Sequence, residues 1–174
     1  MKRQKGFSLI ELLIVVAIIL IIAAIAIPNL LRSKIAANES SAVGSVRTIG
    51  TAEVTYSSSW GTGFAVGLTQ LGGGPPCNVA SALTACLIDP LLSTGANIKS
   101  GYSFGALGTF QDANGIYNGF EVIADPTTVQ TTGVRHFCDD QTGVIKFNMA
   151  AVALAQGNCA NVATAAGISG PVGN

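Results

Sequence analysis

The sequence predicts an α+β fold in which one long N-terminal helix packs on a four-stranded antiparallel sheet and disulfides staple the loops. Three observations predict it. Residues 7–58 are first almost entirely apolar and then amphipathic with helical spacing. Strand-like segments with turns between them occupy residues 100–148, and four cysteines are present. At 174 residues, the chain is long enough for one globular domain and an additional element.

The first half of the predicted helix is apolar enough to cross a membrane. No polar side chain occurs from Leu12 to Ile27, and with its apolar flank the run reaches about 20 residues, the length that a bilayer-spanning helix needs. The basic residues Lys2, Arg3 and Lys5 precede the run, which predicts a cytoplasmic N-terminus. Glu11 interrupts the pattern, because an acidic group at the centre of a bilayer costs roughly 2.5 to 3.5 kcal/mol.

A secretory signal peptide is the competing interpretation of this run. Ala24-Ile25-Ala26 fits the small-x-small cleavage rule, and cleavage after Ala26 would release a soluble protein, for example a binding module. The run is longer than the core of a signal peptide, which has about 7 to 15 residues. A cleavable signal would also gain nothing from Glu11. Both features favour an anchor over a signal peptide.

Cleavage between Gly6 and Phe7 would give Glu11 a partner. The cut leaves the apolar run in place and exposes a cationic α-amine on Phe7, four residues before Glu11. Residues at this spacing lie one helical turn apart. Within one chain the carboxylate would complement the helix N-terminus, and between two packed copies the same pair would neutralise Glu11 and set the axial register.

The segment KGFSLIELLIVVAIILIIAAIAIP, residues 5–28, resembles the N-terminal signature of type IV pilins and of the related pseudopilins of type II secretion. The resemblance implies a pilin fold and removal of the leader after Gly6 by a prepilin peptidase, which also methylates Phe7. It further implies that Glu11 pairs with the N-terminal amine of a neighbouring subunit. The implied partners are copies of the chain in a helical filament, an inner-membrane assembly platform and a cytoplasmic assembly ATPase.

One position departs from the family pattern. Where many pilins have a helix-weakening glycine in the middle of the run, this chain has Leu20, which favours helix. Pro28 still removes one backbone hydrogen bond and disturbs the carbonyl of Ala24. We therefore expect any kink or unwinding between these two residues.

The expected organisation has three parts. A leader would occupy residues 1–6, the membrane-spanning and filament-core half of the helix residues 7–28, and the globular head residues 29–174. Within the head we expect an amphipathic half-helix at 29–58, a loop region at 59–99 with short helical turns around 80–92, a sheet at 100–148, and a C-terminal loop and tail at 149–174. The expected strands of an antiparallel meander are Tyr102–Leu107, Gly119–Ala124, Val134–Cys138 and Gly143–Asn148.

An even number of cysteines behind an export-like N-terminus predicts two disulfides made in an oxidising compartment. Of the three possible connectivities, Cys77–Cys86 and Cys138–Cys159 are favoured because they close short loops. A zinc site is disfavoured, since the chain has no C-x-x-C pair and one histidine. The pilin resemblance implies that the second pair closes a C-terminal loop on the outer filament surface.

Charge and motif content weigh against other function classes. From residue 35 onward, four basic and eight acidic side chains make the head mildly acidic, which disfavours nucleic acid as a partner. His136 has no second histidine or nucleophile pattern beside it, so we expect neither catalysis nor a cofactor. Asp139 and Asp140 open the turn DDQTG and are a weak candidate for calcium; otherwise no metal site is predicted.

The functional expectation is a structural subunit that polymerises into a type IV pilus serving adhesion, motility or a related surface role. It would be an inner-membrane precursor first and part of an extracellular pilus afterwards. A pseudopilin in a periplasmic pseudopilus is the alternative, and four cysteines with a tail loop favour the pilus. The secreted binding protein cleaved after Ala26 is the expectation from a different class.

Overall fold

The computed structural model describes residues 7–149, 157, 159 and 169–172. Residues 1–34 and 35–174 form two separate units, which are described one by one. Gly6 and the rest of the expected leader lie outside the described residues, as does most of the expected tail.

Helix α1 runs from Leu9 to Trp60 and contributes to both units. Its end, two residues beyond the expected one, is marked by Gly61, which has a φ of 65° and donates its N–H to the carbonyl of Ser57. A glycine in this left-handed conformation is a common helix terminator, because it lacks the Cβ that other residues would strain. Pro28 lies inside α1, and the helix continues on both sides of it. A kink there stays a prediction.

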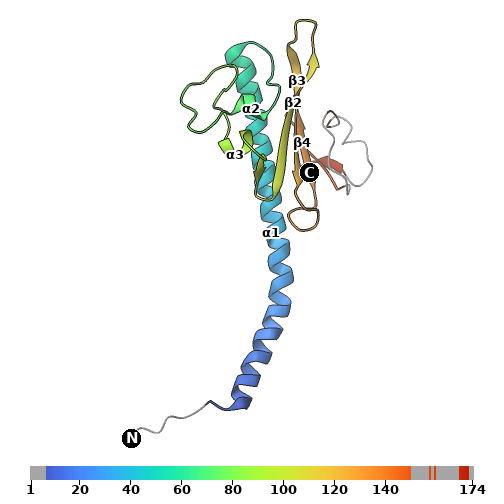
Figure 1. Cartoon of the computed structure of the whole chain (residues 1–174). Coiled ribbons are helices and arrows are strands. Elements are labelled where there is room, and N and C mark those ends of the chain that lie inside the picture. The colour runs from blue at the N-terminus through green and yellow to red at the C-terminus, as the bar shows by residue number, and fades with distance from the viewer. Residues whose placement is uncertain (1–6, 150–156, 158, 160–168, 173–174) are drawn as a thin grey trace. The chain divides into compact units, whose positions relative to one another are not determined.

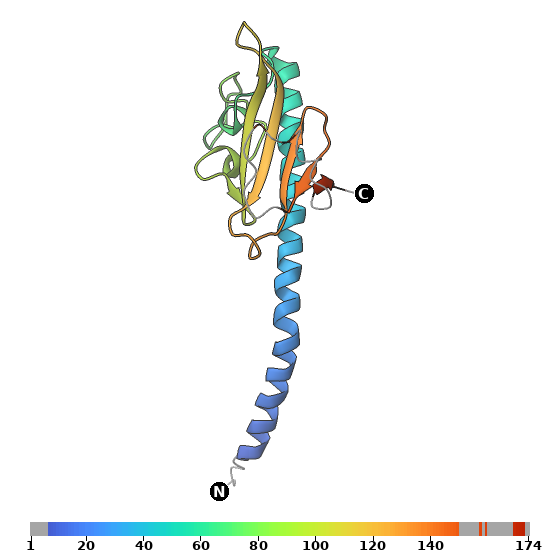
Figure 2. The same ribbon diagram turned by 90° about the vertical axis from the view of Figure 1, so that its right-hand side faces the viewer.

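In the second unit, α1 lies along one face of the sheet, as Figures 1 and 2 show, and its apolar stripe packs into the core. The amphipathic pattern is confirmed, because side chains at intervals of three to four residues are buried together with the sheet's inner face. These helix residues are Ala42, Val46, Ile49, Ala52 and Tyr56.

Six antiparallel strands follow one another across the sheet in chain order, so the expected meander is confirmed. The expected number of four strands is wrong. The two additional strands are short edge strands, and a segment of two or three residues shows no alternation that a sequence pattern could reveal. The strands are β1 (Ile98–Lys99), β2 (Tyr102–Gln111), β3 (Tyr117–Pro126), β4 (His136–Asp140), β5 (Lys146–Asn148) and β6 (Ser169–Pro171).

The hairpin β2–β3 contains the two longest strands of the sheet. Its register pairs Tyr102 with Pro126 at one end and Gln111 with Tyr117 at the other. Strand residues alternate between the two faces, so one side of the hairpin supplies the core. Its fully or almost fully buried side chains are Tyr102, Phe104, Phe120, Val122 and Ala124.

The loop region carries two short helices, α2 (Leu68–Leu71) and α3 (Pro90–Ser93). Helix α3 falls where helical turns were expected; its start is set by Asp89, whose carboxylate accepts the N–H of Leu91. Helix α2 was not expected. The disulfides Cys77–Cys86 and Cys138–Cys159 have the favoured sequential connectivity.

Glu39 on α1 connects the helix to the segment that enters β4. Its buried carboxylate accepts the backbone N–H groups of Val134 and Arg135 at 2.9 and 3.1 Å, and it forms an ion pair with the Arg135 guanidinium at 2.7 Å. The neighbouring Asn38 amide donates to the carbonyl of Thr132 at 2.8 Å. One turn of α1 therefore satisfies the polar groups of the chain entering β4.

Replacing Glu39 by alanine should lower the free energy of unfolding by about 2 to 3 kcal/mol, because two backbone N–H groups and a guanidinium lose their acceptor. Glu39→Gln is the matched control. It keeps an acceptor oxygen and should cost only about 1 kcal/mol. Denaturant unfolding of the detergent-solubilised chain, followed by circular dichroism, measures both. Equal losses in the two variants would contradict the account.

Candidate functional site

The start of α1 is organised by Ser8 and Glu11. The carbonyl of Ser8 accepts the N–H of Leu12 at 3.3 Å, and the Ser8 N–H donates to Oε2 of Glu11 at 2.8 Å. A glutamate three residues after a serine that reaches back to its N–H is one half of a capping box. The sequence reasoning missed this role, although the pattern S-x-x-E at residues 8–11 was available to indicate it. Glu11 thus stabilises its own helix before any partner arrives.

The apolar side chains of the first unit have no cover among the described residues. Phe7 is 84% exposed, and the large side chains from Leu9 to Leu31 are all exposed, with Val16 the lowest at 44%. By length and composition, α1 is able to cross a membrane. A contiguous apolar surface of this kind is stable only against lipid or other protein.

The N-terminal residues match known proteins. The model of the prokaryotic N-terminal methylation motif matches residues 1–27, a range that includes Gly6, Phe7 and Glu11. The type IV wide pilus major component PilA4 of Thermus thermophilus is 62% identical over 39 residues, and the type IV major pilin protein PilA of Myxococcus xanthus is 46% identical over 54 residues. The N-terminal residues of this chain are similar to those of type IV pilins.

The similarity to pilins is confined to part of each protein. The two matches cover 22% and 31% of this chain and 30% and 24% of the relatives. A fimbrial protein of Pseudomonas aeruginosa is 79% identical over 29 residues, which cover 17% of this chain and 19% of that protein. The chain thus spans less than a third of the length of these curated relatives. No solved structure matches it.

The structure places Asp139 and Asp140 in β4. They are the last two residues of β4, and only Asp140 opens the turn, since its carbonyl accepts the N–H of Gly143 at 2.8 Å. The strand therefore points the two carboxylates to opposite faces. Asp139 faces α1, where a Cβ at Gly50 would lie 2.6 Å from its Oδ2, and Asp140 binds Lys146 at 2.7 Å.

These environments have opposite effects on the two carboxyl groups. Burial raises the pKa of Asp139 to about 6, which the N–H of Asp140 only partly opposes. Burial also acts on Asp140, but hydrogen bonds from Lys146 and Thr142 hold its pKa below the ordinary value. The two carboxylates do not converge, and within the described residues no group of three His, Cys, Asp or Glu side chains could hold a metal ion.

His136 lies buried in β4, and its Nδ1 is 2.5 Å from Oδ1 of Asp125. Its Nε2 is buried without a hydrogen-bond partner among the described residues. A histidine and a carboxylate are two parts of a catalytic triad, but no nucleophile accompanies them among these contacts. The pair joins β3 to the start of β4.

The cysteine pair Cys138–Cys159 holds one point of the tail against the sheet. Glu121 on β3 reinforces this connection, because its two oxygens accept the N–H groups of Gly157 and Cys159 at 2.8 and 3.0 Å. Lys146 lies 3.5 Å from the carbonyl of Cys159. A buried carboxylate thus satisfies two backbone hydrogen-bond donors beside the disulfide.

Glu53 is a buried carboxylic acid on the core face of α1, which the sequence reasoning did not identify. It has no exposed surface, its Oε2 accepts the N–H of Ala65 at 2.8 Å, and its Oε1 has no partner among the described residues. Burial raises its pKa to about 7, and the Ala65 N–H only partly opposes this effect. Its spacing from Ile49 and Tyr56 already placed it near the apolar stripe.

The raised pKa of Glu53 predicts that the stability of the head depends on pH. Because the folded pKa is raised from 4.5 to about 7, the protonated acid stabilises the fold. This contribution is fully present below pH 4.5 and is lost as the pH rises through about 7, a change of about 3 kcal/mol. Glu53→Gln cannot titrate, so it should remove this part of the pH dependence of the free energy of unfolding. The smaller loss of stability that ionisation of Asp139 causes as the pH rises should remain.

Unfolding midpoints of both proteins at pH 5 and pH 8 test the assignment. The wild type should lose more stability than Glu53→Gln between these two values, and Asp139→Asn provides the matched comparison for the remaining part. An identical pH dependence in wild type and Glu53→Gln would show that Glu53 does not titrate as assigned.

Proposed function

We propose that this chain is a structural subunit that a prepilin peptidase cuts after Gly6 and methylates on Phe7, and that then polymerises into a type IV pilus. One observation carries the proposal: the methylation motif at residues 1–27 overlaps the first half of α1, where the large apolar side chains from Leu9 to Leu31 are all exposed. The pilus would serve adhesion, motility or a related surface role. The subunit acts by assembly and not by catalysis.

In the proposed mechanism, residues 7–28 serve first as an anchor in the inner membrane and then as the core of the filament. Lipid is as apolar as these side chains, so packing in the membrane gives little net hydrophobic drive between helices. Extraction therefore needs work, which the cytoplasmic ATPase and the assembly platform would supply. The charge of Glu11 can then decide the register between otherwise uniform apolar helices.

The contacts of Glu11 allow two roles at the same time. Its Oε2 accepts the N–H of Ser8, whereas no hydrogen bond to Oε1 occurs among the described residues. An ionised carboxylate has two oxygens with about four acceptor sites in total. The free oxygen is able to accept the methylated amine of Phe7 from a neighbouring copy while the helix cap stays in place.

A pilus is favoured over a type II secretion pseudopilus, since the relatives bear the names of pilus components and fimbrial proteins. The disulfide Cys138–Cys159 supports the same choice by joining the tail to the sheet, as in the C-terminal loop that the pilin resemblance implies. A protein cleaved after Ala26 would lose nearly all of the apolar half of α1, and with it the only described surface that requires assembly partners or lipid.

The mature N-terminus is the first test. Mass spectrometry of the protein sheared from cells of its own host should give a chain that begins at Phe7 and carries one additional methyl group. Gly6 replaced by leucine should accumulate as an uncut precursor in the membrane. A mature chain that begins at Ile27 would refute the proposal.

The charge of Glu11 is the second test. Glu11→Gln keeps an acceptor for the Ser8 N–H, because glutamine also completes a capping box, but it has no charge for the amine. We expect both Glu11→Gln and Glu11→Val to insert normally and to lose filaments by about tenfold or more, measured by electron microscopy and by sheared yield. Normal filaments with Gln alongside a loss with Val would assign Glu11 to helix capping only.

A further inference from the structure

Most charged side chains of the head are already paired within the chain. Of the four basic residues after position 35, all described, Arg47 alone has no carboxylate within 4.0 Å. The pairs of the other three are Lys99–Asp89, Arg135–Glu39 and Lys146–Asp140. Asp139 is near Arg47, but its buried carboxylate faces Gly50 and accepts the N–H of Asp140. Arg47 is exposed on α1.

One exposed carboxylate of the described head is likewise left without a cation. Asp112 stands in the turn between β2 and β3, and its Oδ1 accepts the N–H groups of Asn114 and Ile116 at 2.8 and 2.9 Å. These bonds hold the carboxylate in one orientation, while its Oδ2 has no hydrogen bond among the described residues. The other carboxylates without a cation, Glu53, Glu121 and Asp139, are buried.

Arg47 and Asp112 of one chain lie at different positions along the axis of α1. Figures 1 and 2 both show the β2–β3 turn projecting at the end of the head where α1 terminates. Arg47 precedes the end of α1 at Trp60 by 13 residues, which is about 20 Å along the helix axis. Two copies displaced along this axis by about 20 Å or more would bring Asp112 of one copy level with Arg47 of the other.

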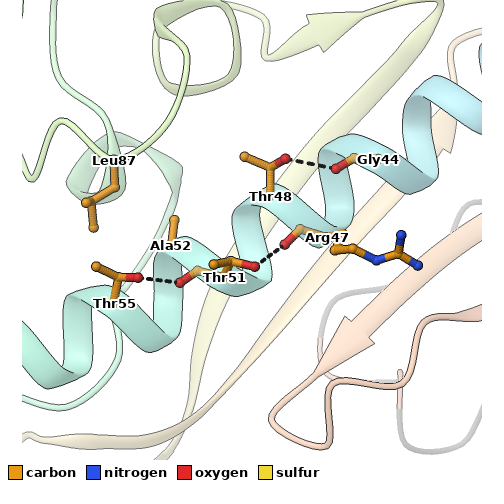
Figure 3. Close-up of a pocket in the computed structure, with 7 residues that line it drawn as sticks. All are labelled: Gly44, Arg47, Thr48, Thr51, Ala52, Thr55 and Leu87. Carbon is orange, nitrogen blue, oxygen red and sulfur yellow. Dashed lines mark hydrogen bonds between the residues drawn. The ribbon is translucent and has the colours of Figure 1, made fainter.

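The surface around Arg47 suits a small turn with one negative charge. Arg47 lines two neighbouring hollows, and the larger, of about 400 Å³, has a floor of small side chains. As Figure 3 shows, the hydroxyls of Thr48, Thr51 and Thr55 donate to carbonyls one turn earlier, so they require no outside partner. The remaining lining residues are Gly44, Ala52 and Leu87. Arg47 is the only charged residue that lines the larger hollow, while Asp139 also lines the smaller one.

We propose that the α1 surface around Arg47 is an interface between copies of this chain, occupied by the β2–β3 turn of a second copy with Asp112 bound to Arg47. The inference rests on the proposed filament and deepens it by naming a contact between heads. An exposed ion pair contributes little affinity by itself. Its effect is on register, because a wrong register leaves both charges unmatched or places like charges together.

A charge exchange tests this contact. Arg47→Glu and Asp112→Lys should each lower the yield of sheared filaments by about tenfold, because each places like charges at the contact. The double variant restores opposite charges and should recover at least half of the wild-type yield. Failure of the double variant to recover would overturn the pairing, and normal yields from both single variants would overturn the interface itself.

Matched controls separate the contact from folding. Asp112→Asn keeps the oxygen that accepts the turn's N–H groups and should give a smaller loss than Asp112→Lys. Lys99→Glu changes the net charge of the head as much as Arg47→Glu does, but its partner Asp89 lies in the same chain. It should therefore assemble normally. A loss equal to that of Arg47→Glu would attribute the effect to net charge and overturn the proposal. Immunoblots of the membrane fraction check that every variant accumulates.

Filament formation by the wild-type chain separates the test of this inference from the test of the proposed function. Wild-type filaments together with unaffected charge variants would overturn the head contact alone, whereas absence of wild-type filaments would overturn both. Cross-linking gives an independent readout. A chain with Arg47→Cys and Asp112→Cys should form ladders of linked copies with a short bismaleimide, and each single variant should not. No ladder from assembled filaments would overturn the contact.

Discussion

The apolar surface of residues 7–31 is the constraint on which the rest of this molecule depends. Its large side chains lie exposed along α1, and no other described residue covers them. Exposure of so much apolar surface to water is unfavourable, so lipid or other protein is needed to cover it. Because both covers are equally apolar, hydrophobic burial sets no register between copies. In the proposed filament, the relative positions of the copies would then be set by the few polar groups, among them Glu11.

Inside the head, buried carboxylates accept backbone N–H groups that the hydrogen bonds of the sheet leave unpaired. Glu39 accepts backbone N–H groups of the segment that enters β4, and Glu53 accepts the N–H of Ala65. Glu121 accepts two N–H groups of the tail. Each carboxylate accepts donors from a segment that lacks regular secondary structure. Burial penalises their charge, and these hydrogen bonds offset the penalty to different degrees. Glu53, with a single donor, has its pKa raised to about 7.

The small number of charges gives each exposed charge a large share in recognition. Charged residues are 10% of the chain, and most of those in the head are paired or buried. A surface with many charges would offer many alternative pairings of similar energy. In the described part of the chain after residue 35, one cation, Arg47, and one exposed carboxylate, Asp112, have no ion pair, so few alternative pairings remain within this unit. In the proposed filament, Glu11 would set the register at the apolar end, and Arg47 would set it at the head.

Local periodicity and spacing were enough to predict the helix, its core stripe at Val46, Ile49 and Tyr56, the order of the antiparallel meander, and the similarity at residues 1–27. The sequence also favoured the disulfides that close short loops. Only the tertiary structure decided the edge strands β1 and β6, the opposite directions of Asp139 and Asp140, and the burial of Glu53. The physical reason is that edge pairing, burial and ion pairing depend on segments far apart in the chain, which leave no periodic trace in either partner.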